Sequence, residues 1–257
     1  MDNYLSITNP LPENVNLFNY SLPLIGYVSR TNTPGPEFDM VKQYVLYLIN
    51  KYKKLKKKSI AVFIEPQIDT GYPDIVIVEY FSLPNLQWEK ARNKLTISDL
   101  KILYYIQSIG NISIEQISST LGYSSDAVTK SVKRLSESRL VYYSSKNSTI
   151  NKVKLSSYCR IKSIIAVEAK VDKWKDALRQ ASNNTWFSTE SFILMKRDTY
   201  SRDIIESCKE KGIGVIIING KIKTKLSSAK RGFPVSYASL QFNEWLLRRI
   251  NNMGDQL

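Results

Sequence analysis

The sequence predicts an α/β protein in which a central mixed sheet is flanked by helices and interrupted by a separate, mainly helical insert. Apolar, β-branched runs of strand length recur in the first and last thirds of the 257-residue chain, as expected for buried strands. Residues 191–218 have the order strand, helix, strand, which favours a parallel crossover. Asp74 and Glu168 each adjoin such a run and are separated by 93 residues, too many for an unstructured loop in a compact domain.

The first α/β segment is predicted to contain one helix and three strands. Residues 22–28 are expected to form an edge strand. Pro36 suits the first turn of the helix that follows, and the helix has a buried stripe of Val41, Tyr44, Val45, Leu48 and Ile49. Residues 59–65 are the next strand, and a turn joins it as a hairpin to a strand headed by Asp74.

The insert is predicted to contain three helices and two strands. Its first helix, capped by Thr96 or Ser98, has apolar residues at three-residue steps, namely Leu100, Leu103, Ile106 and Ile109. A second helix starts at 113–117 and ends near Gly122. The third buries Val128, Val132 and Leu135. Residues 140–143 and 152–155 are expected to be strands that flank a polar loop.

The last α/β segment alternates strands and helices. The expected strands are 164–170, 191–195, 214–218 and 221–224, and the expected helices are 171–181 and 201–211. Asn219-Gly220 is typical of a tight hairpin turn. A closing amphipathic helix is predicted to bury Leu240, Trp245, Leu246 and Ile250, with Arg248 and Arg249 on its polar side.

The residues with the clearest chemical potential are Asp74, Glu168 and Lys170. Asp74 precedes an apolar run, and Glu168-Ala169-Lys170 closes another. Residues i and i+2 of a strand point to the same face, so Glu168 and Lys170 are expected to project together, beside Asp74 if the strands are neighbours. Carboxylate oxygens suit a hard cation such as Mg²⁺. A metal there polarises a phosphodiester and lowers the pKa of the attacking water. The alternative is a solvated Glu–Lys pair at a strand end.

This arrangement resembles the PD-(D/E)xK nuclease superfamily over residues 35–80 and 160–220. The resemblance implies a restriction-endonuclease-like fold and hydrolysis of phosphodiester bonds with Mg²⁺ or Mn²⁺. It implies catalytic roles for Asp74, Glu168, Lys170 and Gln180, the last on the helix after the motif. It implies a metal site of Asp74, Glu168, Ala169 and Glu37.

Several roles in this set stay open. Glu37 is equally explained as an acid that complements the helix dipole, and Asp39 or Glu65 is an alternative further ligand. Gln180 either orients the lysine or a phosphate, or caps a surface.

The insert resembles a winged helix-turn-helix, closest to the MarR-like modules. In such modules the third helix enters the major groove and the wing touches the adjacent backbone. The DNA-binding residues expected on that helix and the wing are Ser125, Thr129, Lys130, Lys133, Arg134, Lys152 and Lys154. Residues 93–155 hold nine basic and four acidic residues, a net charge of +5. The alternative role for such a module is protein interaction.

The amino-acid composition excludes several kinds of catalytic site and favours an anionic partner. The chain has no histidine, so Ser-His-Asp catalysis, Cys-His catalysis and His-ligated zinc are excluded. Its two cysteines are too few for a disulfide framework. The net charge of +14 favours a polyanionic partner, although a generally lysine-rich composition explains it equally. The densest basic run, Lys51 to Lys58, ends a predicted helix, where cations complement the dipole.

We therefore expect a cytoplasmic, metal-dependent DNA endonuclease, with DNA as its partner, no membrane association, and a homodimer as a possible assembly. Residues 1–92 and 157–257 would form the nuclease-like domain, and residues 93–156 the inserted winged helix that selects or positions DNA. The alternative is a winged-helix transcriptional regulator whose outer domain is a degenerate nuclease fold used for dimerisation or partner binding.

Overall fold

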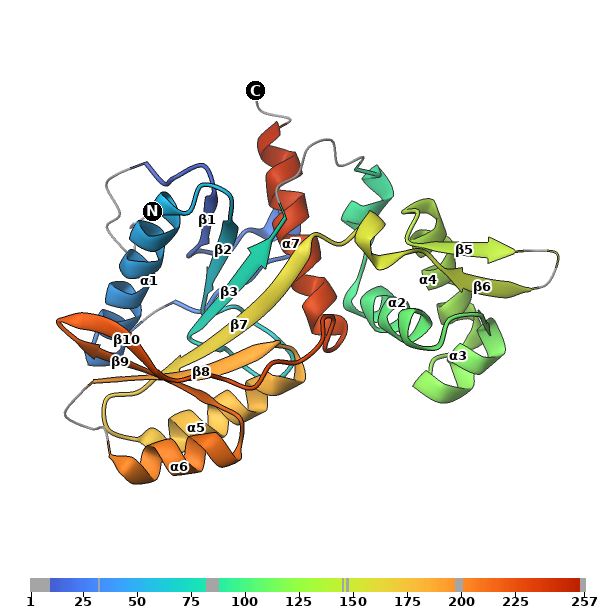
Figure 1. The fold of residues 1–257 in the computed structure, drawn as a ribbon. Helices are drawn as coiled ribbons and strands as arrows, with labels where there is room; N and C mark the ends of the chain where they lie inside the picture. The colour runs from blue at the N-terminus through green and yellow to red at the C-terminus, as the bar shows by residue number, and fades with distance from the viewer. Residues whose placement is uncertain are drawn as a thin grey trace. The chain divides into compact units, whose positions relative to one another are not determined.

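In a computed structural model of the protein, residues 10–31, 33–81, 88–144, 146, 148–196 and 201–254 are described (Figure 1). The chain divides into two compact units. The first, Met1–Ser82 with Ile161–Val235, is an α/β unit; the second, Leu83–Arg160 with Ser236–Leu257, contains the winged helix-turn-helix. The prediction of an α/β domain interrupted by an insert is therefore confirmed in outline.

The α/β unit is built on a seven-stranded mixed sheet with the order β1-β2-β3-β7-β8-β9-β10. The strands are β1 (Val15–Phe18), β2 (Ser59–Ile64), β3 (Ile75–Tyr80), β7 (Ile161–Ala169), β8 (Glu190–Lys196), β9 (Gly214–Asn219) and β10 (Lys221–Leu226). An antiparallel meander runs through β2, β3 and β7, whereas β8 and β9 continue parallel to β7. The predicted hairpin, the parallel crossover and the turn at Asn219-Gly220 are confirmed.

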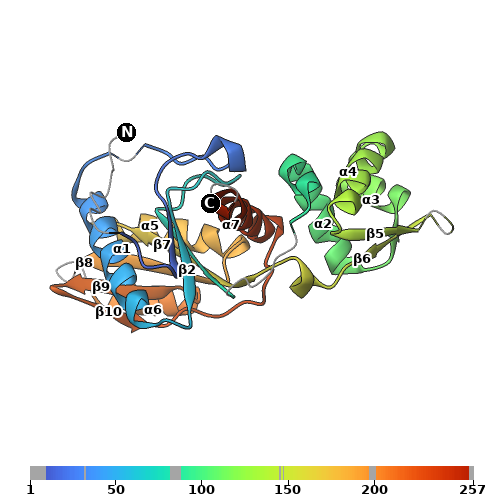
Figure 2. The same cartoon turned by 90° about the horizontal axis from the view of Figure 1, so that it is seen from above.

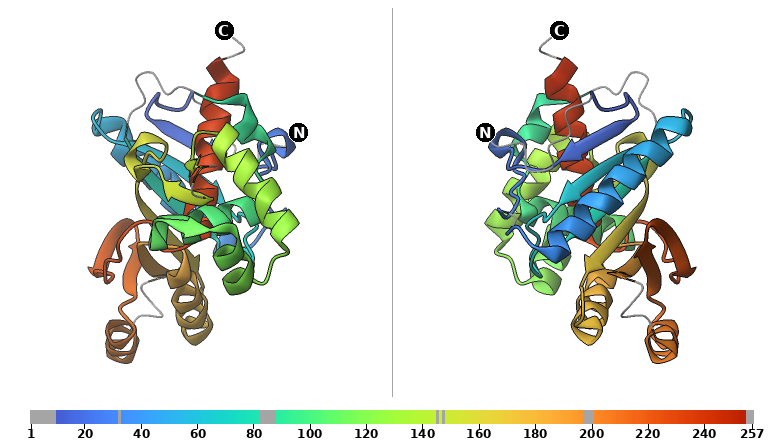
Figure 3. Two further views of the ribbon diagram at one scale, coloured as in Figure 1. Left: turned by 90° about the vertical axis from the view of Figure 1, so that its right-hand side faces the viewer. Right: turned by 90° about the vertical axis from the view of Figure 1, so that its left-hand side faces the viewer.

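Three helices cover the two faces of this sheet. Helix α1 (Pro36–Lys54) packs on one face, and α5 (Trp174–Asn183) and α6 (Arg202–Glu210) pack on the other (Figure 3). Because side chains alternate along a strand, Leu194 of β8 faces α1, whereas Ile193 and Met195 face α5 and α6. Both sides of the central strands are therefore buried.

The N-terminal segment differs from its prediction. The edge strand is β1, parallel to β2, whereas residues 22–28 contain the 3₁₀ turn Pro23–Ile25. Proline lacks the N–H that a strand ladder needs. The buried Tyr27 instead anchors the segment, since its hydroxyl donates to the carbonyl oxygens of Phe18 at 3.1 Å and Ile64 at 3.0 Å.

The second unit contains the three predicted helices, α2 (Ile97–Ile109), α3 (Ile114–Leu121) and α4 (Ser125–Glu137). Thr96 and Ser113 close capping boxes at the starts of α2 and α3. Gly122 ends α3 in the left-handed conformation, with φ 71°, which glycine adopts without steric cost. Helices α3 and α4 lie on one side of the wing strands (Figure 2).

The wing is a three-stranded sheet with the order β4-β6-β5. Strand β5 (Val141–Ser144) agrees with its prediction, but β6 is Thr149–Lys152 and not 152–155. The short β4 (Ile112–Ser113) was not predicted and pairs Ile112 with Ile150. Because this pairing buries Ile150, the strand register is set three residues earlier than expected.

Helix α7 (Tyr237–Gly254) belongs to the second unit, so the predicted boundaries at 92/93 and 156/157 need correction. The physical reason is a buried polar cluster. Arg92 Nη2 forms an ion pair with Glu244 Oε1 at 2.5 Å, and both side chains are almost fully buried. Arg248, expected on the polar side, is buried and donates to the Arg92 carbonyl oxygen at 2.7 Å. None of the described helices is long and apolar enough to cross a membrane.

Candidate functional site

The end of the β3–β7 pair brings Asp74, Glu168 and Lys170 together. Asp74 immediately precedes β3, and Ile75 pairs with Val167 of β7. Asp74 Oδ2 accepts a hydrogen bond from the Ala169 backbone N–H at 2.7 Å. Residues that are 95 positions apart in the chain therefore meet at one sheet edge.

Glu168 and Lys170 have different partners although they line one cavity. Glu168 is only 3% exposed, and its Oε1 accepts from Asn184 Nδ2 at 2.6 Å. Lys170 lies one residue beyond the end of β7, and its Nζ donates to Glu37 Oε2 at 2.9 Å. Glu37 is in the first turn of α1, so this ion pair ties the helix to the strand end.

Burial makes the two carboxyl groups unusually weak acids. Burial raises the pKa of Asp74 to about 6, against the opposing effects of the Ala169 N–H and the Lys170 charge. Burial also raises the pKa of Glu168 well above its usual value, and the neighbouring Asp74 charge adds to this rise. Two adjacent buried carboxylates repel each other, so a cation beside both would favour their ionised forms.

Lys170 is the cation already present. Burial acts to lower the pKa of Lys170, but its hydrogen bond to Glu37 and the nearby charges of Asp74 and Glu168 outweigh burial and raise it. The ammonium group is therefore held in its charged form next to the two acids.

A cavity of about 310 Å³ opens at this position. Its lining includes Asp74, Glu168 and Lys170, together with Arg30, Arg179 and Gln180. An adjoining hollow of about 370 Å³ is lined by Glu37, Lys170, Lys173, Arg179 and Gln180 among others. Gln180 lines both hollows, and its Oε1 atom is buried with no hydrogen-bond partner among the described residues; its role stays a prediction.

The four-residue metal set Asp74, Glu168, Ala169 and Glu37 is not assembled around one point. Within the described ranges, no three His, Cys, Asp or Glu side chains are grouped to hold a metal ion. Glu37 accepts a hydrogen bond from Lys170, and the Ala169 N–H donates one to Asp74. Mg²⁺ commonly uses one or two carboxylates together with substrate phosphates and water. Asp74 and Glu168 fit that open type of site.

Of the two other candidate ligands, Glu65 lies next to Asp74, and its backbone N–H donates to the Asp74 carbonyl oxygen at 3.1 Å. Glu65 adopts a left-handed conformation with φ 43°, and its Oε2 is 2.5 Å from Arg30 Nε. Asp39 is exposed in the first turn of α1. Neither carboxylate is placed to join Asp74 and Glu168 as a third metal ligand. Glu65 is neutralised by Arg30, and Asp39 is not among the residues that line the cavity.

Two further residues of the site were not found by sequence reasoning. Asn184 orients Glu168 but follows α5, where nothing in the sequence distinguishes it from a surface asparagine. Arg30 precedes a loop and lines the cavity. Its proximity depends on the irregular segment anchored by Tyr27, which the sequence did not predict.

In the winged unit, most of the predicted DNA-contacting side chains are accessible. Ser125, Thr129, Lys130 and Lys133 are exposed on α4, as are Lys152 at the end of β6 and Lys154 beyond it. The Thr129 hydroxyl donates to the Ser125 carbonyl oxygen at 2.8 Å. Exposed hydroxyls and ammonium groups on one helix suit phosphates and base edges.

Arg134 is the exception. Its Nη2 and Nε atoms lie 2.7 Å and 2.9 Å from the carboxylate of the fully buried Asp99. Asp99 also closes the α2 capping box, so its buried charge requires a counter-ion. Arg134 therefore holds α4 against α2, and its side chain is 32% exposed, so a DNA contact from Arg134 stays a prediction.

Two wing tyrosines were overlooked. Tyr142 and Tyr143 of β5 are 66% and 44% exposed. The sequence pattern could have identified one of them, because two consecutive tyrosines in a short strand direct their rings to opposite faces, and one face is exposed.

Comparison with known proteins identifies one part of the chain. Residues 95–142, from the cap of α2 into β5, match a family model described as winged helix-turn-helix DNA-binding. No curated protein and no solved structure matches the chain. The chain therefore carries a winged helix-turn-helix DNA-binding domain at residues 95–142.

Proposed function

We propose that the protein is a metal-dependent DNA endonuclease of PD-(D/E)xK type, in which the winged helix binds the DNA that the α/β unit cuts. The observation that carries this proposal is the meeting of Asp74, Glu168 and Lys170 at one sheet edge, in a cavity. A purely structural role accounts poorly for two adjacent acids, Glu168 buried and Asp74 half-buried, whose pKa values are both raised, since perturbed groups of this kind concentrate at functional sites.

Each residue has a definite part in the proposed reaction. A bound Mg²⁺ or Mn²⁺ would polarise the phosphodiester and activate water. Asp74 and Glu168 would hold that ion; their orientations are set by hydrogen bonds from the Ala169 N–H and the Asn184 amide. Lys170 holds the attacking water or a non-bridging phosphate oxygen, after exchanging its bond to Glu37. Gln180 lines the cavity and would orient Lys170 or a phosphate group.

The decisive experiment is cleavage of plasmid and oligonucleotide duplexes by purified protein with Mg²⁺, Mn²⁺ or EDTA. Asp74→Asn, Glu168→Gln and Lys170→Met should each reduce divalent-dependent cleavage at least ~10²-fold, because a catalytic metal supplies several kcal/mol of transition-state stabilisation. Glu210→Gln, an exposed acid at the end of α6, is the matched control. Cleavage by the triple variant at the wild-type rate would refute the assignment.

A second candidate, a winged-helix DNA-binding regulator, is favoured by a different observation. Among the described residues, no three His, Cys, Asp or Glu side chains are grouped so that they could hold a metal ion, and Lys170 is paired with Glu37. In a regulator, the same variants would leave DNA binding intact and no preparation of the wild-type protein would cleave DNA with either metal. Detection of cleavage that EDTA abolishes and that Asp74→Asn lacks separates the two candidates.

A further inference from the structure

Six exposed lysines gather at the C-terminal end of α1. They are Lys51, Lys53, Lys54, Lys56, Lys57 and Lys58, here called the α1 lysine cluster. Within the part of the chain that the structure describes, none of them forms an ion pair with a carboxylate; Lys51 lies over the ring of the buried Tyr52. Like charges at this density repel one another, so the cluster costs stability unless an anion is bound.

Local structure does not require these charges. Lysines at a helix C-terminus usually complement the unpaired carbonyl groups, but here Asn14 takes that role. Its Nδ2 donates to the carbonyl oxygens of Tyr52 at 2.9 Å and Lys58 at 2.7 Å, with a longer contact to Leu55 at 3.3 Å. The Leu55 N–H also donates to the Tyr52 carbonyl oxygen at 2.9 Å. The helix end is closed without any ammonium group.

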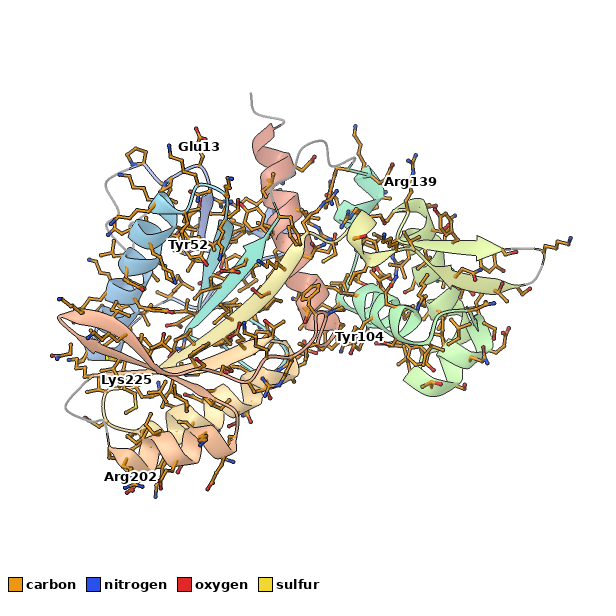
Figure 4. The ribbon with its side chains drawn as sticks, in the orientation of Figure 1. Glu13, Tyr52, Tyr104, Arg139, Arg202 and Lys225 are labelled. Atoms are coloured by element: carbon orange, nitrogen blue, oxygen red, sulfur yellow. The ribbon has the colours of Figure 1, made fainter. Side chains whose placement is uncertain are left out.

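Few acids are placed to neutralise the cluster. Glu13 precedes Asn14 and is exposed at the same end of the unit (Figure 4). Glu79 faces inward, where its carboxylate accepts from the Tyr52 hydroxyl and from Ser163 Oγ. Lys162, exposed beside Ser163 on β7, adds another cation. The surface is therefore strongly positive.

The position of the α1 lysine cluster in the sheet indicates its partner. Lys58 leads directly into β2, whose first residue, Ser59, pairs with Tyr80 at the end of β3. Tyr80 pairs in turn with Ile161 at the start of β7. These are the points at which the chain leaves for the winged unit and returns from it. The cluster therefore leads into a strand end that lies one strand spacing, roughly 5 Å, from Tyr80 and two spacings, roughly 10 Å, from Ile161, at the upper end of the sheet in Figure 1.

We infer that the α1 lysine cluster is a second DNA-binding surface, which holds the phosphate backbone of the duplex bound by the winged helix. This rests on DNA being the partner of the chain, as proposed above. Lysines act on phosphates as point charges and carry no base information, so the cluster adds affinity and not sequence preference. Because the cluster and the winged unit belong to one chain, binding of the recognition helix to DNA raises the effective concentration of the cluster near the same duplex.

The test is equilibrium binding of a fluorescent duplex to the full-length protein at salt concentrations from about 50 to 200 mM. The test variant is Lys53→Gln, Lys54→Gln, Lys56→Gln and Lys57→Gln together. The charge-matched control replaces four exposed lysines of the same unit that also lack a carboxylate partner among the described residues, Lys211, Lys221, Lys223 and Lys225, by glutamine. Both variants lose four charges, so the general effect of net charge cancels.

The cluster variant should flatten the dependence of log affinity on log salt by about two to four units, at about 0.9 for each lost phosphate contact, and the control by less than one. Equal slopes for the two variants would overturn the inference. So would an unchanged DNA affinity accompanied by loss of binding to vesicles containing phosphatidylserine, which would identify a membrane surface. The nuclease proposal is tested separately, by comparing DNA cleavage by wild type with DNA cleavage by Asp74→Asn.

Discussion

At the scale of single residues, the Asp74–Glu168 pair is under electrostatic stress that a bound cation would relieve. An acid whose folded pKa is raised contributes stability below its ordinary pKa, and that contribution is lost as pH rises through the folded value. For Asp74 the loss is complete above about pH 6. At neutral pH without metal, the ionised pair therefore lowers the free energy of unfolding.

Neutralising either acid should relieve this stress. We expect Asp74→Asn to raise the free energy of unfolding at pH 7.5 in EDTA by about 1 to 3 kcal/mol, since one pKa unit is worth about 1.36 kcal/mol, and Glu168→Gln to raise it as well. Wild type should be stabilised by Mg²⁺ or Mn²⁺ and these variants should not. Thermal denaturation with and without metal measures both effects, and a metal-induced rise in Tm that persists in both variants would place the ion elsewhere.

Asp99 shows the opposite behaviour. Burial favours its neutral form, but hydrogen bonds from Arg134, Ser131 and Thr96 outweigh burial and lower the pKa of Asp99. A lowered folded pKa gives stability that is present above the ordinary pKa of aspartate and is lost as pH falls through the folded value. The winged unit should therefore lose stability below about pH 4.

The corresponding variant is Asp99→Asn. It should destabilise the winged unit at pH 7 by about 1 to 3 kcal/mol, because Arg134 loses its charged acceptor. The cost should shrink from pH 7 to pH 3, because the stability that the lowered pKa of Asp99 provides is lost as pH falls below the ordinary pKa of aspartate. Circular dichroism melts at both pH values test this, with Glu210→Gln as a surface control. A pH-independent cost would show that packing, and not charge, is lost.

The candidate site was predictable at its strand-borne residues and less so elsewhere. Asp74 and Glu168 adjoin apolar runs, so sheet periodicity and pairing determine where they lie. Asn184 and Arg30 reach the cavity from irregular segments, whose paths depend on tertiary packing. The ion pair of Arg134 with Asp99 was not predicted, because periodicity identifies the polar face of α4 but not the buried acid on α2.

At the scale of secondary structure elements, helix α4 is the expected DNA-reading element. Lys130→Ala with Lys133→Ala should weaken duplex binding and flatten its salt dependence by about two units, at about 0.9 for each lost phosphate contact. The matched control is Lys209→Ala with Lys211→Ala in the α/β unit, both exposed. Fluorescence anisotropy over a salt series gives both slopes. Identical slopes would indicate that α4 faces away from DNA, and a protein-interaction role would be preferred.

Helices were predicted more accurately than wing strands, for a local reason. Thr96, Ser113 and Gly122 mark helix ends through side-chain caps or backbone conformation, and these signals are contained in a few consecutive residues. The register of β6 instead depends on its pairing with β4, about 40 residues earlier. A two-residue strand has too short a pattern to be recognised in isolation.

At the scale of the whole molecule, the α/β unit should fold without its insert. Tyr80 and Ile161 are paired on adjacent antiparallel strands, so a short Gly/Ser hairpin loop can join 1–82 to 161–235. The hairpin-joined variant omits α7, whose apolar residues Leu240, Phe242 and Leu246 are buried in the full-length chain. Size-exclusion chromatography and melting should show a folded monomeric or dimeric species that Mg²⁺ stabilises.

A second variant provides the control for this test. It lacks only residues 95–155, so it keeps α7 but loses α2, the helix against which α7 packs. We expect that protein to aggregate, because exposed apolar helix faces promote association. If both deletions behave alike, α7 does not depend on the winged unit, and the unit boundaries derived from the structure are wrong.

The bond between Asp74 and Ala169 has a consequence for the order in which the protein is made. Its two ends are 95 residues apart, so at about 5 to 20 residues per second the ribosome completes α2, α3 and α4 before the second half of the acid pair has been synthesised. The helical insert, rich in local contacts, is expected to fold first. A nascent chain thus acquires its winged helix well before the strand ends that carry Asp74 and Glu168 can pair. Stopped-flow refolding should accordingly be faster for the hairpin-joined α/β unit than for the full-length chain.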